Sequence, residues 1–223
     1  MGAIYKPDKR LALCAYFVRK GMAVADIGTD HAYLPIWLVE TAGIPRAVAA
    51  DINEGPLMRA RENIKKCGLE EKIGTRLSNG LERIEPDEAD DIIIAGMGAE
   101  LICKIISACG WIRDSKKHLI LQPMSKYEVL LRFLYENGFS VAEQKCTQSG
   151  GKYYTVILCS YSGKTEEFSE TDCFLGKLDL NDGDSRAFLN KKLCSLKKRA
   201  IGEPQLENVI SEIEARLSAE EII

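Results

Sequence analysis

The chain reads Val24-Ala25-Asp26-Ile27-Gly28-Thr29-Asp30-His31-Ala32-Tyr33-Leu34-Pro35 near its N-terminus. A short apolar run ends in an acid and a glycine, and a second apolar segment with helix-like spacing follows. This is the layout of the first strand, the ligand-binding turn and the first helix of an open α/β sheet. Gly28 allows a backbone conformation that residues with a Cβ atom resist, and it lets a ligand approach the main chain. The stretch therefore predicts a binding turn for a nucleotide-like ligand.

The turn lacks the glycines of a dinucleotide fingerprint. Counted from Gly28, the second and third glycine positions of G-x-G-x-x-G hold Asp30 and Tyr33. A pyrophosphate would meet the Asp30 carboxylate where it needs room and positive potential. A ligand with a cationic centre and no phosphate suits this turn better. S-adenosylmethionine (SAM), which combines a sulfonium, an amino acid and a nucleoside, is such a ligand and is the predicted cofactor.

The composition is that of a folded protein rather than a disordered chain. Of the 223 residues, 46% are hydrophobic and 28% are charged. No apolar run approaches the roughly 20 residues that span a membrane, and residues 1–7 lack the apolar core of a secretory signal. We therefore expect a cytoplasmic protein with no membrane partner. The net charge of −3 argues against nonspecific coating of nucleic acid and leaves room for a local basic face.

Cysteine and histidine spacing gives no sign of a metal site. The eight cysteines form no C-x-x-C pair, and the chain has only two histidines, His31 and His118. Zinc sites require ligand spacings that are absent here. We expect no bound metal and mostly buried, reduced thiols.

Apolar periodicity predicts a helix that Asp8 caps and that runs to about Arg19, then five strand-and-helix units and a β-hairpin. The expected strands are 24–27, 47–50, 73–77, 91–95, 118–121, 140–144 and 153–160, and the expected helices between them are 34–40, 56–67, 99–108 and 126–137. The pattern alone indicates a parallel α/β sheet and leaves the last strand pair open. The order matches a Rossmann-like class I methyltransferase with a seven-stranded mixed sheet, in which the last strand inserts antiparallel.

The composition shifts to helix formers after residue 162. Apolar residues recur with 4-3-4 spacing in two segments: Leu189, Leu193, Leu196 and Ala200, then Leu206, Ile210, Ile213 and Leu217. Gly202-Glu203-Pro204 separates them as a helix stop and restart. We predict a methyltransferase domain at 1–162 and an appendage of two antiparallel, coiled-coil-like helices at 163–223.

The two predicted arms of this appendage differ in charge. The first carries Lys191, Lys192, Lys197, Lys198 and Arg199, and the second carries Glu203, Glu207, Glu212 and Glu214. Salt bridges between the arms would explain the pattern. Contact between the basic arm and RNA phosphates would explain it equally well, and both interpretations stay open.

Acidic and amide residues follow the predicted strands at the edge where a ligand binds an α/β sheet. Asp26 is placed to fix the binding turn and to lie near the amino-acid end of SAM, although it would also serve as a simple turn cap. Asp51 is placed to accept both ribose hydroxyls, in a SAM site or an NAD site alike. Asn79 would bond the adenine amino group or belong to a plain turn.

Two glycines follow the fourth predicted strand, in Gly96-Met97-Gly98, which we interpret as a turn that brings the backbone close to substrate. Met97 offers a soft apolar surface to a flat ring. Gln122-Pro123-Met124 ends the fifth predicted strand at the same edge. The expected cofactor-binding set is Asp26, Gly28, Thr29, Asp30, His31, Asp51, Ile52, Asn53, Asn79, Gly80, Gly96, Met97 and Gly98.

Taken together, 26–35, Asn53-Glu54-Gly55-Pro56, Ala95-Gly96-Met97-Gly98 and Leu119-Ile120-Leu121-Gln122-Pro123 resemble the bacterial tRNA (adenine-22-N1)-methyltransferase family. The resemblance covers nearly the whole chain. It implies a SAM-dependent class I enzyme that methylates N1 of adenine 22 in the D-loop region of tRNA. It also implies that the C-terminal helices help to hold the tRNA.

Three segments depart from the family pattern. The chain has Met124 where Asn is expected after Gln-Pro, Ser78-Asn79-Gly80 where Gly-Asp-Gly is expected, and Lys152-Tyr153-Tyr154-Thr155 where a His-Tyr-Glu-like run is usual. The N-P-P-Y tetrad of enzymes that methylate adenine N6 is also absent, because its place holds Ala95-Gly96-Met97-Gly98. We therefore do not expect N6 chemistry.

The resemblance implies direct in-line methyl transfer without a metal. Positioning and exclusion of water would supply most of the catalysis. Asp30 is the candidate to stabilise the positive charge that develops, and His31, Tyr33 and Gln122 are candidates to hold the base. A small-molecule methyltransferase, an NAD-dependent oxidoreductase and a catalytically silent RNA-binding module are the competing interpretations.

Overall fold

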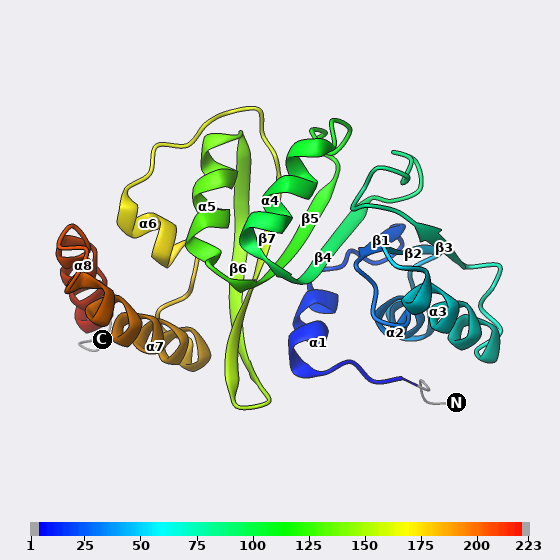
Figure 1. Cartoon of the computed structure of the whole chain (residues 1–223), viewed down its shortest axis with the longest axis horizontal. Coiled ribbons are helices and arrows are strands. Elements are labelled where there is room, and N and C mark those ends of the chain that lie inside the picture. Colours follow the sequence, from blue (N-terminus) through cyan, green and yellow to red (C-terminus); the bar gives the residue numbers. More distant parts are fainter. Residues whose placement is uncertain (1–4, 220–223) are drawn as a thin grey trace.

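Seven strands form one sheet in the computed structural model, which describes residues 5–219, and their order is β3-β2-β1-β4-β5-β7-β6 (Figure 1). The strands are β1 (Val24–Ile27), β2 (Ala47–Asp51), β3 (Ile73–Leu77), β4 (Asp91–Gly98), β5 (His118–Ser125), β6 (Phe139–Ser149) and β7 (Lys152–Tyr161). The first five run parallel, and β7 lies antiparallel between β5 and β6. The predicted mixed sheet with an inserted last strand is confirmed.

Helices cover both faces of this sheet. They are α1 (Lys9–Tyr16), α2 (Tyr33–Trp37) with the π-helical turn η1 (Leu38–Ala42), α3 (Glu54–Lys66), α4 (Ala99–Ala108), α5 (Tyr127–Glu136), α6 (Glu170–Leu175), α7 (Gly183–Ala200) and α8 (Leu206–Ala219). The short helix α6 escaped sequence analysis because six residues are too few to show a helical period. None of the helices within residues 5–219 is long and apolar enough to cross a membrane.

The two faces of the sheet carry separate apolar cores because neighbouring strand residues point to opposite sides. Ile92 and Ile94 pack with α4 and α5 on one face. Ile93, between them, packs with α1, α2 and α3 on the other face. This alternation determines which helices cover each face of the sheet.

The C-terminal helices have a core of their own. Leu189, Leu193 and Leu196 of α7 are buried against Ile210 and Ile213 of α8, as the 4-3-4 spacing predicted. Cys146 of β6 joins the same cluster, so the helical region rests on the outer strand of the sheet. In Figure 1, α7 and α8 lie at one end of the molecule and β3 lies at the other.

Strands β4, β5 and β6 are several residues longer than predicted, and the expected turn at 96–98 is wrong. Strand β4 continues through Gly96-Met97-Gly98 because β5 continues beside it to Ser125 and supplies pairing partners. The register shifts between Ala95 and Met97 mark a bulge, and Gly96 takes the left-handed φ of +78° that this bulge requires.

A buried ion pair ties the segment after α1 to the sheet. The Asp91 carboxylate, fully buried, accepts from the Arg19 backbone N–H at 2.7 Å and from Arg19 Nε at 2.8 Å. These bonds hold the end of α1 over the start of β4. They therefore help to set where the rest of α1 meets the carboxyl edge.

We expect Asp91→Asn to lower the free energy of unfolding by about 2 kcal/mol, since it removes the charge from two charge-assisted hydrogen bonds. Urea denaturation followed by circular dichroism measures this. Asp87→Asn, a change at an exposed acid with no side-chain partner within residues 5–219, is the control and should stay within about 0.5 kcal/mol of wild type. Equal stability of the two variants would contradict the structural role of Asp91.

Candidate functional site

A cavity of about 240 Å³ opens at the carboxyl edge of the sheet, where β1 and β4 lie side by side. Strand order reverses at this point, and α/β proteins bind ligands in the crevice that such a reversal creates. The residues that line the cavity are Arg10, Leu11, Asp26, Gly28, Asp30, Leu34, Ala95 and Gly96.

The turn after β1 is pinned to the neighbouring strand. The N–H groups of Gly28 and Thr29 both donate to the Ala50 carbonyl, at 2.8 and 2.9 Å. Gly28 has a left-handed φ of +77°, and a Cβ atom built there would lie 2.2 Å from Cε of Met97. The left-handed φ therefore favours glycine at this position, and the end of the Met97 side chain would have to move to admit a Cβ atom.

Asp26 is a buried carboxylate at the base of the cavity. Its side chain accepts a hydrogen bond of 2.6 Å from Thr29 Oγ1, and the residue is only 6% exposed. Burial raises the pKa of Asp26 to about 6, while the Thr29 hydrogen bond and the Arg10 guanidinium act in the opposite direction. A cationic ligand group beside Asp26 would relieve this cost of burial.

The residues after the turn hold an unusual backbone conformation. His31 and Ala32 both have positive φ angles, 56° and 59°, which cost energy for residues with a Cβ atom. Helix α2 consequently begins at Tyr33, with Ala32 as its N-cap and no side-chain capping bond. Asp30 is therefore not a helix cap. Its side chain is 81% exposed and lines the cavity.

The structure brings His31 and Tyr33 together, but neither lines the cavity that contains Asp26. His31 Nδ1 lies 3.2 Å from the Tyr33 hydroxyl, and Nε2 lies 3.4 Å from Arg59 Nη1 of α3. The Tyr33 ring packs on Tyr5, with 4.6 Å between the ring centroids. These two candidates sit on the α3 side of the turn.

Gln122 is fully buried and holds two parts of the site in place. Its Oε1 accepts from the Gly96 N–H at 3.0 Å and from Arg10 Nη1 at 2.7 Å, and its Nε2 donates to the Pro123 carbonyl at 2.9 Å. All of its polar atoms therefore have partners within the protein. This environment suits a residue that positions the Gly96 bulge and Arg10.

Arg10 is the charged residue of the cavity that sequence analysis missed. It belongs to α1 and reaches Gln122 across 112 positions of the chain. Its guanidinium also lies 5.9 Å from the centroid of the Tyr154 ring. No spacing in the sequence links a charged residue of the first helix to the end of the fifth strand, so only the packing of α1 over this edge could reveal it.

The end of β2 offers a second carboxylate beside the turn. Asp51 Oδ1 accepts from the Asn53 N–H at 2.7 Å, and its other oxygen has no partner within residues 5–219. Ile52, the next residue in the chain, is 61% exposed and offers an apolar surface. Asn53 occupies the N-cap position of α3 without forming a side-chain capping bond.

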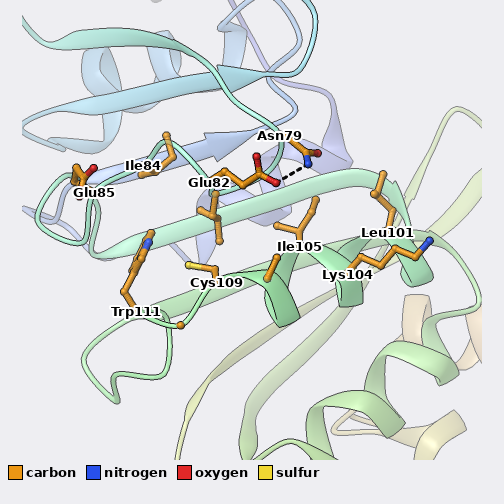
Figure 2. Close-up of a pocket in the computed structure, with 12 residues that line it drawn as sticks. Asn79, Glu82, Ile84, Glu85, Leu101, Lys104, Ile105, Cys109 and Trp111 are labelled. Atoms are coloured by element: carbon orange, nitrogen blue, oxygen red, sulfur yellow. Dashed lines mark hydrogen bonds between the residues drawn. The ribbon is translucent and has the colours of Figure 1, made fainter.

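Asn79 faces a separate cavity of about 410 Å³ between the turn after β3 and helix α4 (Figure 2). Its Nδ2 donates to Glu82 Oε1 at 2.7 Å. Gly80 lies beside Ile105 of α4, where an added Cβ atom would come within 3.0 Å. Asn79 thus lines a different cavity from the one that contains Asp26, and Gly80 lines neither of the two. Within residues 5–219, no group of three or more His, Cys, Asp or Glu side chains could hold a metal.

Comparison with known proteins supplies the family. Residues 8–157 match the methyltransferase domain family. The tRNA (adenine(22)-N(1))-methyltransferase of Bacillus subtilis is 34% identical over 173 residues, which cover 78% of this chain and 73% of the relative. The chain belongs to the tRNA (adenine(22)-N(1))-methyltransferase family. The resemblance inferred from its motifs is confirmed.

Solved structures of this family share the fold over nearly the full chain. The tRNA (m1A22) methyltransferase Sp1610 of Streptococcus pneumoniae, in complex with S-adenosyl-L-methionine, superposes with a TM-score of 0.85 at 33% identity, covering 95% of this chain and all of the other. TrmK of M. capricolum with S-adenosyl-homocysteine gives a TM-score of 0.78 at 26% identity, covering 95% and 98%. The helical C-terminal region is therefore common to these methyltransferases.

Proposed function

We propose that this chain transfers a methyl group from SAM to N1 of adenine 22 in tRNA. The observation that carries the proposal is the cavity at the β1/β4 strand reversal, in a chain of this methyltransferase family. Its carboxylates, Asp26 and Asp30, favour a cationic ligand over a phosphate. The relatives support the ligand, because the S. pneumoniae and M. capricolum structures hold SAM and its product.

The residues of the cavity fit SAM. Asp26 would accept the α-ammonium group, which accounts for a carboxylate kept buried despite its raised pKa. The unpaired oxygen of Asp51 would accept the ribose hydroxyls, and Ile52 would pack on the adenine ring. Gly28 and Gly96 leave the backbone open to the ligand. When bound, SAM supplies a methyl group on a sulfonium, with a thioether as leaving group.

This chain's own contribution is positioning and charge. The N1 atom of adenine carries a free lone pair, so no residue has to remove a proton before transfer. Asp30 lies at the rim of the cavity and would stabilise the positive charge that develops on the base. Its carboxylate is exposed now, and bound RNA would have to exclude water for this effect to be strong. Gln122 would keep Gly96 and Arg10 in place during the reaction.

The proposed activity is tested with methyl-labelled SAM and unmodified tRNA, followed by digestion and identification of the labelled nucleoside. We expect 1-methyladenosine at position 22. Label in a free nucleoside or metabolite, and none in tRNA, would instead support a small-molecule methyltransferase. Failure to bind SAM in calorimetry would support a silent RNA-binding module.

We further propose that part of the basic arm contacts tRNA. Three of its five basic residues have acidic partners: Lys192 with Glu128, Lys197 with Glu214, and Arg199 with Glu203. Lys191 and Lys198 have no ion-pair partner within residues 5–219. Their spacing of seven places both on one face of α7. Salt bridging thus accounts for three residues, and phosphate contact is assigned to the other two.

Replacing Lys191 and Lys198 together with Gln should weaken tRNA binding and reduce the slope of log affinity against log salt by about 1.5, since each phosphate contact contributes about 0.7 to 0.9. Filter binding at several salt concentrations measures both. Lys164→Gln, at an exposed lysine beyond the opposite end of β7, is the control. An unchanged slope would make this arm purely structural.

A tRNA substrate also implies a cytoplasmic enzyme, with 163–223 as its appended RNA-binding part.

A further inference from the structure

A second cavity lies beside the proposed methyl-transfer site, between the end of β5, the β6–β7 hairpin and helix α7. Its volume is about 370 Å³. The hairpin extends past the ends of the neighbouring strands, which places its tip beside α7 (Figure 1). Of the residues that line it, only Lys191 has so far been assigned a contact with tRNA.

The lining of this cavity carries positive charge without negative charge. Lys126, Lys152, Lys191 and Lys192 line it, and no Asp or Glu does so among residues 5–219. Lys126 and Lys192 are neutralised from outside by Glu100 and Glu128. Lys152 and Lys191 have no ion-pair partner in the described part of the chain. Two cationic side chains from different elements therefore line one cavity, and together they could bind an anion.

An aromatic ring accompanies these charges. Tyr153 lines the cavity and is only partly buried. Neighbouring strand residues point to opposite faces, and the Tyr154 ring lies over Arg10 of α1. Tyr153 consequently points to the other face, which α7 covers. Met124, which is 48% exposed, lines the cavity on the β5 side. It adds a polarisable apolar surface there.

The two cavities are direct neighbours. Tyr154 of β7 borders the second cavity and contacts Arg10, which lines the first. Pro123 lines the second cavity, and Gln122 just before it bonds Arg10 and Gly96 of the first. A polymer whose target base lay at the mouth of the first cavity, against the SAM held there, would therefore pass its next residue over the second.

We propose that this second cavity binds the nucleotide that adjoins the target adenine, with its base stacked on Tyr153 and its phosphate beside Lys152 and Lys191. The inference rests on the proposed tRNA substrate and assigns it a further subsite. A stacked base and a backbone phosphate are the two groups that a paired aromatic and lysine surface recognises in flexible RNA. Holding the neighbour would also help to keep the target adenine out of the helical stack.

The first test compares Tyr153→Leu with Tyr153→Phe in the full-length protein. We expect Tyr153→Leu to raise the KM for tRNA about tenfold and Tyr153→Phe to stay within about twofold, because phenylalanine keeps the stacking face. SAM affinity and melting temperature should match wild type in both. Lys152→Gln should lower the salt slope of tRNA binding by about 0.8, with Lys164→Gln as the control. A wild-type KM for Tyr153→Leu would overturn the proposal.

The second test locates the stacked base. Synthetic tRNAs carry an abasic nucleotide at position 21 or at position 23, and each is assayed with wild type and Tyr153→Leu. At one of the two positions, the loss of activity caused by the abasic nucleotide and the loss caused by Tyr153→Leu should not add. The missing base and the missing ring would then belong to one contact. Additive losses at both positions would overturn the proposal. Failure of the proposed function itself is distinct, because wild type would then form no 1-methyladenosine in intact tRNA.

Discussion

Asp26→Ala is expected to abolish SAM binding, and the isosteric Asp26→Asn to weaken it by about 100-fold, because both remove the one charge that is buried at the base of the cavity. Asp26→Asn keeps an oxygen that can accept the Thr29 hydroxyl bond. The loss of SAM affinity in Asp26→Asn therefore measures the contribution of the negative charge, because the shape of the turn is kept. Isothermal titration with SAM measures the affinity, and Asp87→Asn is the control.

The same residue predicts a pH dependence of binding. The pKa of Asp26 is raised to about 6 by burial, so the carboxylate becomes protonated as the pH falls below that value. SAM affinity of the wild type should then fall, by about tenfold per pH unit well below pH 6. Asp26→Asn should show no such dependence. A flat wild-type profile between pH 5 and 8 would contradict the assignment.

Stability should change in the opposite direction to binding. A carboxyl group whose pKa is raised by folding stabilises the fold below its unfolded pKa, and this stabilisation is lost as the pH rises through about 6. At pH 7 the ionised Asp26 therefore costs the free protein up to about 3 kcal/mol. Asp26→Asn should raise the melting temperature at pH 7 and not at pH 4. A variant less stable than wild type at pH 7 would show that the carboxylate is needed for folding.

Gly28→Ala is expected to weaken SAM binding by about 100-fold and to lower the free energy of unfolding by about 2 kcal/mol. Alanine is strained at a φ of +77°, and its methyl group would meet Met97 Cε. The added methyl would also stand where the backbone must be open to the ligand. Calorimetry and urea denaturation measure the two effects separately.

The double variant Gly28→Ala with Met97→Ala separates these causes. Removing the Met97 side chain relieves the clash and should restore part of the stability, while the strained φ remains. SAM binding should stay weak, since the alanine methyl still lies in the ligand's path. Met97→Ala alone is the matched control. Full recovery of SAM affinity in the double variant would show that the clash with Met97, rather than closure of the turn, explains the loss.

Local sequence patterns predicted the elements that carry a clear apolar run or a clear apolar period. The strand at Val24–Ile27 and the seam of Leu189, Leu193 and Leu196 follow from apolar spacing, and the structure confirms both. Patterns failed where pairing with another strand mattered. Gly96-Met97-Gly98 looked like a turn, but β5 supplied a partner and the segment continues β4 through a bulge.

Only part of the predicted site shares one cavity. Asp26, Gly28, Asp30 and Gly96 line the same cavity, and the other predicted site residues lie outside it. His31 has a positive φ and lies outside this cavity, with Nε2 3.4 Å from Arg59 Nη1 and 3.6 Å from Asp30 Oδ1. Residue types and strand ends indicate which groups meet at an edge, whereas backbone conformation decides which way each side chain points.

By itself, the sequence determined the glycine turn at Asp26-Ile27-Gly28, the order of the strands and of the helices other than α6, and the pair of C-terminal helices, because each depends on neighbours in the chain. Only the tertiary structure placed Arg10 against Gln122 and Lys152 opposite Lys191. Those pairs join residues far apart in sequence. Their meeting depends on how α1 and α7 pack against the sheet, and no local pattern encodes that packing.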